Sequence, residues 1–377
     1  MAGTVVVEKR SDVTTVTPMM QQYMEVKAQY EDYVLLYRLG DFYECFFEDA
    51  ITASRELELT LTGRDCGDGK RAAMCGVPFH KADVYVGRLV EHGFKVAVCE
   101  QVSDPKESQG LVKREVTRVV TPGTVTDSAV LSEDKNNFLM AICYTGSSCA
   151  VAVADISTGE VSATNLSGDD LFLFLKNEIG AYSPAEIIMN CPSEELSEAV
   201  FFAKDRFSTL ITDNATRLFA YDKAKEATRV VFDDESDKLT ESELIMATGA
   251  LIAYIHETQK TEVTFARGIN VYSRGQYLDL DLNTRRNLEL TESMRTKEKK
   301  GSLLWVLDKT KTAMGKRMLH SFLLRPLIDP IKISKRQAAV SDMLSSRRQR
   351  DMLGELFADV LDIERLKGYL PKYSGSA

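Results

Sequence analysis

The sequence predicts a multidomain protein in which two α/β domains are followed by a segment built only from helices. Its 377 residues suffice for two or three domains, and 44% hydrophobic with 27% charged residues is typical of a globular chain. Strand-like and helix-like runs alternate through the first two thirds of the chain, whereas only helical patterns follow residue 263. These observations place the predicted domains at residues 1–127, 128–262 and 263–377.

The first domain is predicted to contain a mixed sheet with helices. Thr17 is a suitable helix N-cap, and Pro18 fits the first turn that follows it. The helix expected from residue 82 should end at Gly93. Helix-like stretches cover residues 45–57 and 82–92, and strand-like runs cover residues 34–38, 58–62, 95–100 and 112–120.

The second domain is predicted to begin with three adjacent strands and to continue with helix and strand. Strand-like segments cover residues 138–144, 148–156, 161 onward and 186–189. Residues 240–260 form a strong helix pattern, and Thr240 with Glu243 has the spacing of a capping box.

The third domain is predicted to be a helical bundle that is cut short. Pro326 and Pro330 interrupt the series, and Trp305 is expected in the core. The chain stops at Ala377 without an obvious closing element. The expected helices cover residues 283–291, 302–307, 314–324, 334–345 and 351–370.

Composition excludes several classes of protein. No apolar run is long enough to span a membrane, and the N-terminus lacks the apolar core of a secretory signal. The seven cysteines form no Cys-x-x-Cys pair, which predicts buried, reduced thiols rather than a zinc site. A cytoplasmic protein is therefore expected. The net charge of −9 means that any contact with DNA must be local.

The most informative segment is Gly40-Asp41-Phe42-Tyr43-Glu44, which follows the apolar run 34–37. A junction that turns at glycine presents an aromatic ring and a carboxylate two residues apart. Such a pair could probe a weak point in a DNA duplex, although aromatic residues after a strand are usually part of the core.

Further motifs in family order make this segment specific. The chain resembles the N-terminal part of the bacterial MutS family of DNA mismatch-recognition proteins. Residues 37–44 contain that family's Phe-x-Glu motif, and residues 155–159 resemble its connector domain. The other matching segments are residues 17–23, 75–80, 99–101, 118–124, 284–289 and 314–319.

The resemblance implies a mismatch-binding domain, an RNase H-like connector and the start of a helical core or lever domain. Family members continue with a DNA clamp and a P-loop ATPase domain, which binds ATP and Mg²⁺ and forms a homodimer. No P-loop motif occurs here, because Arg71 and Arg317 follow the two Gly-Lys pairs. The chain is therefore expected to be non-enzymatic and monomeric, without a cofactor of its own. The implied partners are mismatched duplex DNA and, through the connector, a MutL-type protein; a nucleoid-associated location follows.

Physical reasoning gives Phe42 the role of a wedge. A mispair has already lost some stacking, so inserting a ring from the minor groove and kinking the duplex costs less there. The resemblance implies that Glu44 hydrogen-bonds the mispaired base, which it could do as a protonated acid facing a base acceptor. The negative charge of Glu44 would also repel the phosphates of normal duplex, where the hydrogen bond to a mispaired base cannot form. Alternatively, Glu44 only supplies negative charge to the first turn of the next helix.

Arg64 and Arg114 match family positions expected near DNA, where phosphate contacts would fix the register. Lys113 and Arg118 either support these contacts or face solvent. Tyr43 is expected to pack inward, because it alternates with Phe42 and Glu44 along the chain.

Two alternative functions remain open. Asp155, followed by Glu160, could belong to a two-metal nuclease site, but an aspartate before Ser157-Thr158-Gly159 is more typical of a turn. The four scattered histidines indicate no metal site. The other alternative is an interaction scaffold in which connector and lever serve as docking surfaces.

Overall fold

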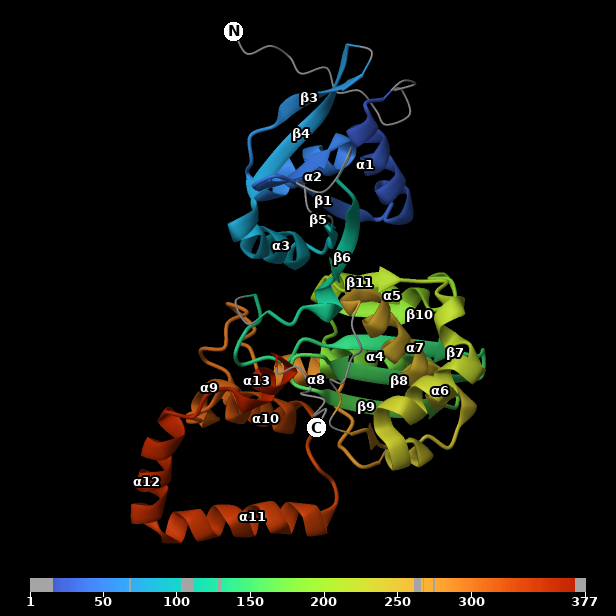
Figure 1. Cartoon of the computed structure of the whole chain (residues 1–377). Coiled ribbons are helices and arrows are strands. Elements are labelled where there is room, and N and C mark those ends of the chain that lie inside the picture. The colour runs from blue at the N-terminus through green and yellow to red at the C-terminus, as the bar shows by residue number, and fades with distance from the viewer. Residues whose placement is uncertain are drawn as a thin grey trace, which may run out of the picture. The chain divides into compact units, whose positions relative to one another are not determined.

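A computed structural model describes residues 16–67, 69–102, 112–127, 130–260, 266, 268–273 and 275–369. The chain divides into two compact units. Unit 1 comprises Met1–Thr124 and His256–Val263, and unit 2 comprises Val125–Ile255 and Thr264–Ala377. The boundaries predicted from sequence fall at or beside residues outside the described ranges. Each unit is built on its own sheet (Figure 1).

Unit 1 contains a mixed sheet, as the sequence predicts, and this sheet has six strands. The strand order is β3-β4-β2-β1-β5-β6. Only β1 and β5 pair in parallel, and the other neighbours are antiparallel. The strands are β1 (Tyr33–Leu39), β2 (Phe42–Phe46), β3 (Thr62–Gly67), β4 (Lys70–Pro78), β5 (Lys95–Gln101) and β6 (Arg114–Val120).

Helices cover both faces of this sheet. On one face, Met20 and Tyr23 of α1 (Pro18–Gln29) pack with Tyr37 and Phe46. On the other face, Cys75 of β4 contacts α2 (Phe47–Leu57), and α3 (Ala82–Glu91) lies against β5. Because side chains alternate along a strand, Phe42 and Glu44 share the face of Phe46. They extend that face beyond the part that α1 covers.

Several sequence predictions in unit 1 are confirmed. The Thr17 hydroxyl accepts a hydrogen bond from Met20 N, so Thr17 caps α1, and α3 ends before Gly93. The helix expected from residue 45 begins at residue 47 instead, because residues 42–46 form β2. The strand expected at residues 58–62 is wrong: Glu58 adopts a left-handed conformation (φ 56°) that ends α2, and β3 begins at Thr62.

Unit 2 contains a second six-stranded sheet in the order β11-β10-β7-β8-β9-β12. The three predicted adjacent strands are antiparallel neighbours, and β10 pairs in parallel with β7. The strands are β7 (Leu139–Tyr144), β8 (Ser148–Asp155), β9 (Glu160–Ser167), β10 (Glu186–Met189), β11 (Leu210–Thr212) and β12 (Asn270–Val271). Their hydrophobic core includes residues of α4 (Leu171–Tyr182) and α5 (Ser197–Phe207).

The capping box predicted for the long helix of unit 2 is not formed. Helix α7 (Ser242–Gln259) begins two residues after Thr240, and the Glu243 carboxylate accepts hydrogen bonds from Ser242 and Ser148. The hydrogen bond from the Ser242 hydroxyl is the largest of the effects on the pKa of Glu243 and lowers it. This carboxylate therefore links the start of α7 to β8.

The last third of the chain is helical, as predicted, although its elements differ in detail. The single helix expected at residues 351–370 is two helices, and the Trp305 side chain is 48% exposed rather than in the core. No helix of the described residues combines the length and apolar composition needed to span a bilayer. The helices are α8 (Leu282–Asn287), α9 (Leu303–Leu307), α10 (Ala313–Leu324), α11 (Pro330–Ser345), α12 (Arg347–Ala358) and α13 (Ile363–Tyr369).

A close helix crossing in unit 2 gives a testable stability prediction. A Cβ at Gly249 of α7 would lie 2.3 Å from Cα and Cβ of Ala224 in α6 (Tyr221–Phe232). Because backbone would have to move, Gly249→Val should lower the free energy of unfolding by about 3 kcal/mol. Urea denaturation measures this change. Gly354→Ala, at a position with open space, should be neutral or stabilising; an equal loss in both variants would contradict the packing explanation.

Candidate nucleic-acid interface

A tight turn holds the segment that the sequence analysis singled out. Leu39 pairs with Phe42, so Gly40 and Asp41 form a two-residue hairpin turn between β1 and β2. Gly40 has φ 59°, a conformation that favours glycine and is typical of the first position of such turns. Arg38 Nε donates to Gly40 O at 2.5 Å, and Phe79 N donates to Asp41 O at 3.0 Å. The turn is therefore fixed from both sides.

Phe42 is displayed at the end of this turn. Its side chain is 47% exposed, although exposing a large apolar ring loses the free energy of its burial. Tyr43 points to the opposite face, where it is buried and its hydroxyl bonds to Glu100, which confirms the predicted alternation. Neighbouring Phe79 is also exposed, and the Arg38 guanidinium stacks 3.9 Å from its ring centre. Phe79 and Arg38 are not among the residues predicted to contact DNA, although they lie in the matching segments 75–80 and 37–44.

Glu44 is paired across the sheet with Arg64. Arg64 Nη1 lies 2.5 Å from Glu44 Oε2, and the side chains are 39% and 16% exposed. Arg64 reaches over β4, where Gly76 faces Glu44: a Cβ at position 76 would lie 3.4 Å from Glu44 Cγ. Helix α2 begins at Phe47 and has its own acids in the first turn, so Glu44 is not needed there. Glu44 therefore lies in β2 and not in the first turn of α2, where its alternative role placed it.

The remaining predicted basic residues occupy different environments. Arg114 is only 9% exposed, and its guanidinium donates to Arg38 O at 2.8 Å and Gln22 Oε1 at 2.9 Å. It supports the strand that leads into the hairpin turn rather than presenting charge to solvent. Lys113 is exposed and Arg118 is half-buried, and they pair with nearby acids at 2.5 and 2.6 Å. Surface pairs of this kind are weak enough to exchange partners.

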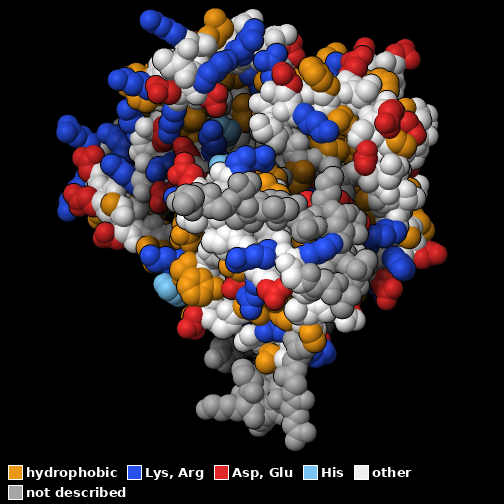
Figure 2. Space-filling view, turned by 90° about the horizontal axis from the view of Figure 1, so that it is seen from above, with side chains coloured by type: hydrophobic (Ala, Val, Ile, Leu, Met, Phe, Trp, Pro, Cys, Tyr) orange, Lys and Arg blue, Asp and Glu red, His pale blue; other side chains and the backbone are white. Residues whose placement is uncertain are grey.

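Charge is distributed in small groups. Figure 2 shows Lys and Arg side chains interspersed with Asp and Glu on the face in view. All seven cysteine side chains are buried, as predicted.

Asp155 forms a turn, as predicted. Its Oδ1 accepts hydrogen bonds from Ser157 N at 2.9 Å and Ser157 Oγ at 2.6 Å, and its backbone oxygen accepts from Gly159 N. Burial, followed by repulsion from Asp155, raises the pKa of Glu160. Within the described ranges, no three His, Cys, Asp or Glu side chains are arranged to hold a metal ion. The structure therefore offers no specific support for the nuclease alternative.

Comparison with known proteins extends these observations over most of the chain. The family models MutS domain I, MutS domain II and MutS domain III match residues 17–129, 137–266 and 283–375, respectively. A DNA mismatch repair protein MutS from Ruminiclostridium cellulolyticum is 48% identical over 94% of this chain. The MutS proteins of Acetivibrio thermocellus and Clostridium perfringens are 47% and 45% identical to this chain, over 94% and 96% of its length, respectively.

The chain belongs to the MutS family. The mixed sheet of unit 1, with Phe42 and Glu44, lies in the match to MutS domain I. The chain spans 41%, 41% and 39% of the lengths of these three MutS relatives.

Proposed function

We propose that this chain recognises mispaired duplex DNA and serves the mismatch-recognition step of DNA mismatch repair. The observation that supports this function best is the exposed Phe42 ring on a fixed turn, two residues from a carboxylate, within a MutS domain I. Stability alone would favour burying such a ring.

In the proposed mechanism, Phe42 enters the duplex from the minor groove and stacks on the mispaired base. Unstacking and kinking one step costs a few kcal/mol, and less where pairing is already lost. Stacking of a base on the ring returns about 1–3 kcal/mol. The balance favours insertion at a mispair and opposes it in normal duplex.

Glu44 hydrogen-bonds the mispaired base in this proposal. Arg64 neutralises the carboxylate in the free protein and moves toward a backbone phosphate when Glu44 meets the base. Lys113 and Arg118 make further phosphate contacts, which fix register without reading sequence. Arg114 keeps its internal bonds and holds β1 in place.

A competition titration tests the proposed function. Fluorescence anisotropy of a labelled mispaired duplex with this chain at low salt should show weak binding, with Kd above about 1 μM, because one module makes few phosphate contacts. Unlabelled mispaired duplex should compete better than the matched duplex of the same sequence. Equal competition by both would contradict the proposal, and sub-micromolar affinity would contradict the expected weakness.

Replacing Glu44 tests the repulsive part of the mechanism. Glu44→Gln removes a negative charge facing phosphates, so the affinity for matched duplex should rise by about three- to tenfold, equivalent to about 0.7–1.4 kcal/mol. The ratio of the affinities for mispaired and matched duplex should therefore fall. Glu48→Gln makes the same charge change at an exposed position of α2 and should leave discrimination unchanged. If both variants behave alike, the effect is one of net charge.

The resemblance also suggests partners and context. We propose that the connector segment contacts a MutL-type protein and that family members dimerise through an ATPase domain that uses ATP and Mg²⁺. An RNase H-like connector, a non-catalytic role for this segment and a cytoplasmic, nucleoid-associated location remain predictions.

A further inference from the structure

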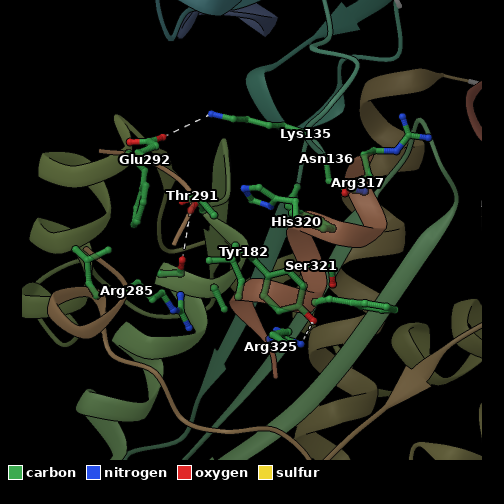
Figure 3. A pocket seen from close by; sticks show the side chains of 18 of the residues that line it. Lys135, Asn136, Tyr182, Arg285, Thr291, Glu292, Arg317, His320, Ser321 and Arg325 are labelled. Atoms are coloured by element: carbon green, nitrogen blue, oxygen red, sulfur yellow. Dashed lines mark hydrogen bonds and ion pairs between the residues drawn. The ribbon is translucent and has the colours of Figure 1, made fainter. Parts of the chain in front are cut away.

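Unit 2 contains a basic cavity that the proposed DNA-binding role does not use. Its volume is about 670 Å³, within the range of small-molecule sites. Basic side chains outnumber acidic ones along its wall by eight to three. Figure 3 shows Arg285, Thr291 and Glu292 on one side of the cavity and Arg317 with Asn136 on the other.

Several of these basic groups already have acidic partners. Arg317 binds Asp362 through two bonds of 2.7 and 2.8 Å, and Arg325 pairs with Glu178. Lys135 Nζ lies 3.7 Å from Glu292. These residues therefore form the wall, and their charges are largely balanced within the protein.

Arg285 differs from them. It is only 8% exposed, and among the described residues its Nε and Nη1 atoms have no hydrogen-bond partner. Nη1 lies over Gly180, 3.4 Å from where a Cβ would stand. Burial, followed by the charge of Arg325, lowers the pKa of Arg285 to about 10, so it remains charged at neutral pH. A buried guanidinium charge with two unpaired nitrogens is costly, and a bound anion would offset that cost.

We propose that this cavity binds a small phosphorylated molecule whose phosphate oxygens accept hydrogen bonds from the Arg285 guanidinium. A phosphate offers several acceptor oxygens and up to two negative charges, which suits an arginine beside the further charge of Arg325. The cavity volume leaves room for an organic group next to the phosphate. Phe138 and Tyr277 provide apolar surface for it, and Thr291 provides a hydroxyl.

Isothermal titration calorimetry of the whole 377-residue chain tests the site. Inorganic phosphate and ribose 5-phosphate should bind at a single saturable site, the sugar phosphate more tightly, and acetate at equal ionic strength should bind much more weakly. Arg285→Gln should weaken phosphate binding by about tenfold or more, since charge-assisted bonds to the anion are lost. Arg206→Gln removes a charge from the same wall at a half-exposed position and should change the affinity less than about twofold.

Thermal unfolding separates loss of the site from loss of the fold. Ribose 5-phosphate should raise the Tm of the unaltered chain and of Arg206→Gln but not that of Arg285→Gln. Arg285→Lys keeps the charge while removing the planar guanidinium, and it should bind more weakly than the unaltered chain. The proposal is overturned if phosphate does not saturate, if acetate binds equally well, if Arg285→Lys or Arg285→Gln binds like the unaltered chain, or if Arg206→Gln loses as much affinity as Arg285→Gln.

Discussion

Phe42→Ala should abolish the preference of the chain for mispaired duplex. The substitution removes the ring that would replace lost base stacking, so the ratio of Kd values for matched and mispaired duplex should fall to about one. Stability should change little, because the ring is about half exposed. Competition anisotropy measures the ratio. The same ratio would also be measured in a chimera in which this chain replaces the matching segment of the Ruminiclostridium cellulolyticum relative. The chimera is expected to bind DNA more tightly, and Phe42→Ala should have the same effect on the ratio there.

The control for this experiment is another exposed phenylalanine. Phe201 of α5 is 70% exposed, and Phe201→Ala makes the same substitution in unit 2. Discrimination should survive in that variant. Undiminished mispair preference in Phe42→Ala would refute the wedge mechanism.

Lys27→Met should cause a large loss of stability in unit 1. Lys27 Nζ lies 2.9 Å from Asp49 Oδ1, and the two side chains are nearly buried, linking α1 to α2. Asp49 also accepts a hydrogen bond from Leu35 N at 3.0 Å. Breaking a buried pair by removing one partner typically costs about 3–5 kcal/mol, because a charge is left unpaired. Urea denaturation at pH 7 should show a loss of this order.

The same variant has an expected pH dependence. Burial raises the pKa of Asp49, and Lys27 opposes that shift. Without Lys27 the folded-state pKa rises further, so the penalty is full above that pKa and shrinks as acidification protonates Asp49. Lys176→Met, which breaks an exposed pair with Glu198, should cost at most about 1 kcal/mol. The buried-charge explanation would be excluded if Lys27→Met lost no more stability than Lys176→Met, or if its loss of stability did not depend on pH.

The sequence predicts the turn at Gly40, although not the strand that follows it, because the determinants of the turn are local. Gly40 suits the left-handed position, Thr17 caps the first helix, and alternation alone separates Tyr43 from Phe42. Helix and strand patterns are ambiguous over a few residues, however. The helix predicted from residue 45 therefore includes the last two residues of β2. The left-handed conformation of Glu58, which ends α2, has no signal in the sequence.

Long-range pairing explains most of what the sequence could not reveal. Arg64 meets Glu44 only because β3, β4 and β2 are neighbours with a particular register and Gly76 lies between them. Arg114 is buried although arginine is usually exposed, since partners distant in sequence accept its hydrogen bonds. Trp305 is exposed in a short helix whose pattern resembles that of a core helix.

Photocrosslinking from position 42 tests the central claim most directly. Phe42 would be replaced by p-benzoylphenylalanine and the chain irradiated with a duplex containing one mispair. Insertion of the ring predicts crosslinks concentrated at the mispaired nucleotides and little reaction with matched duplex. Crosslinks spread evenly along both duplexes, or bound DNA without crosslinks at the mispair, would contradict the account.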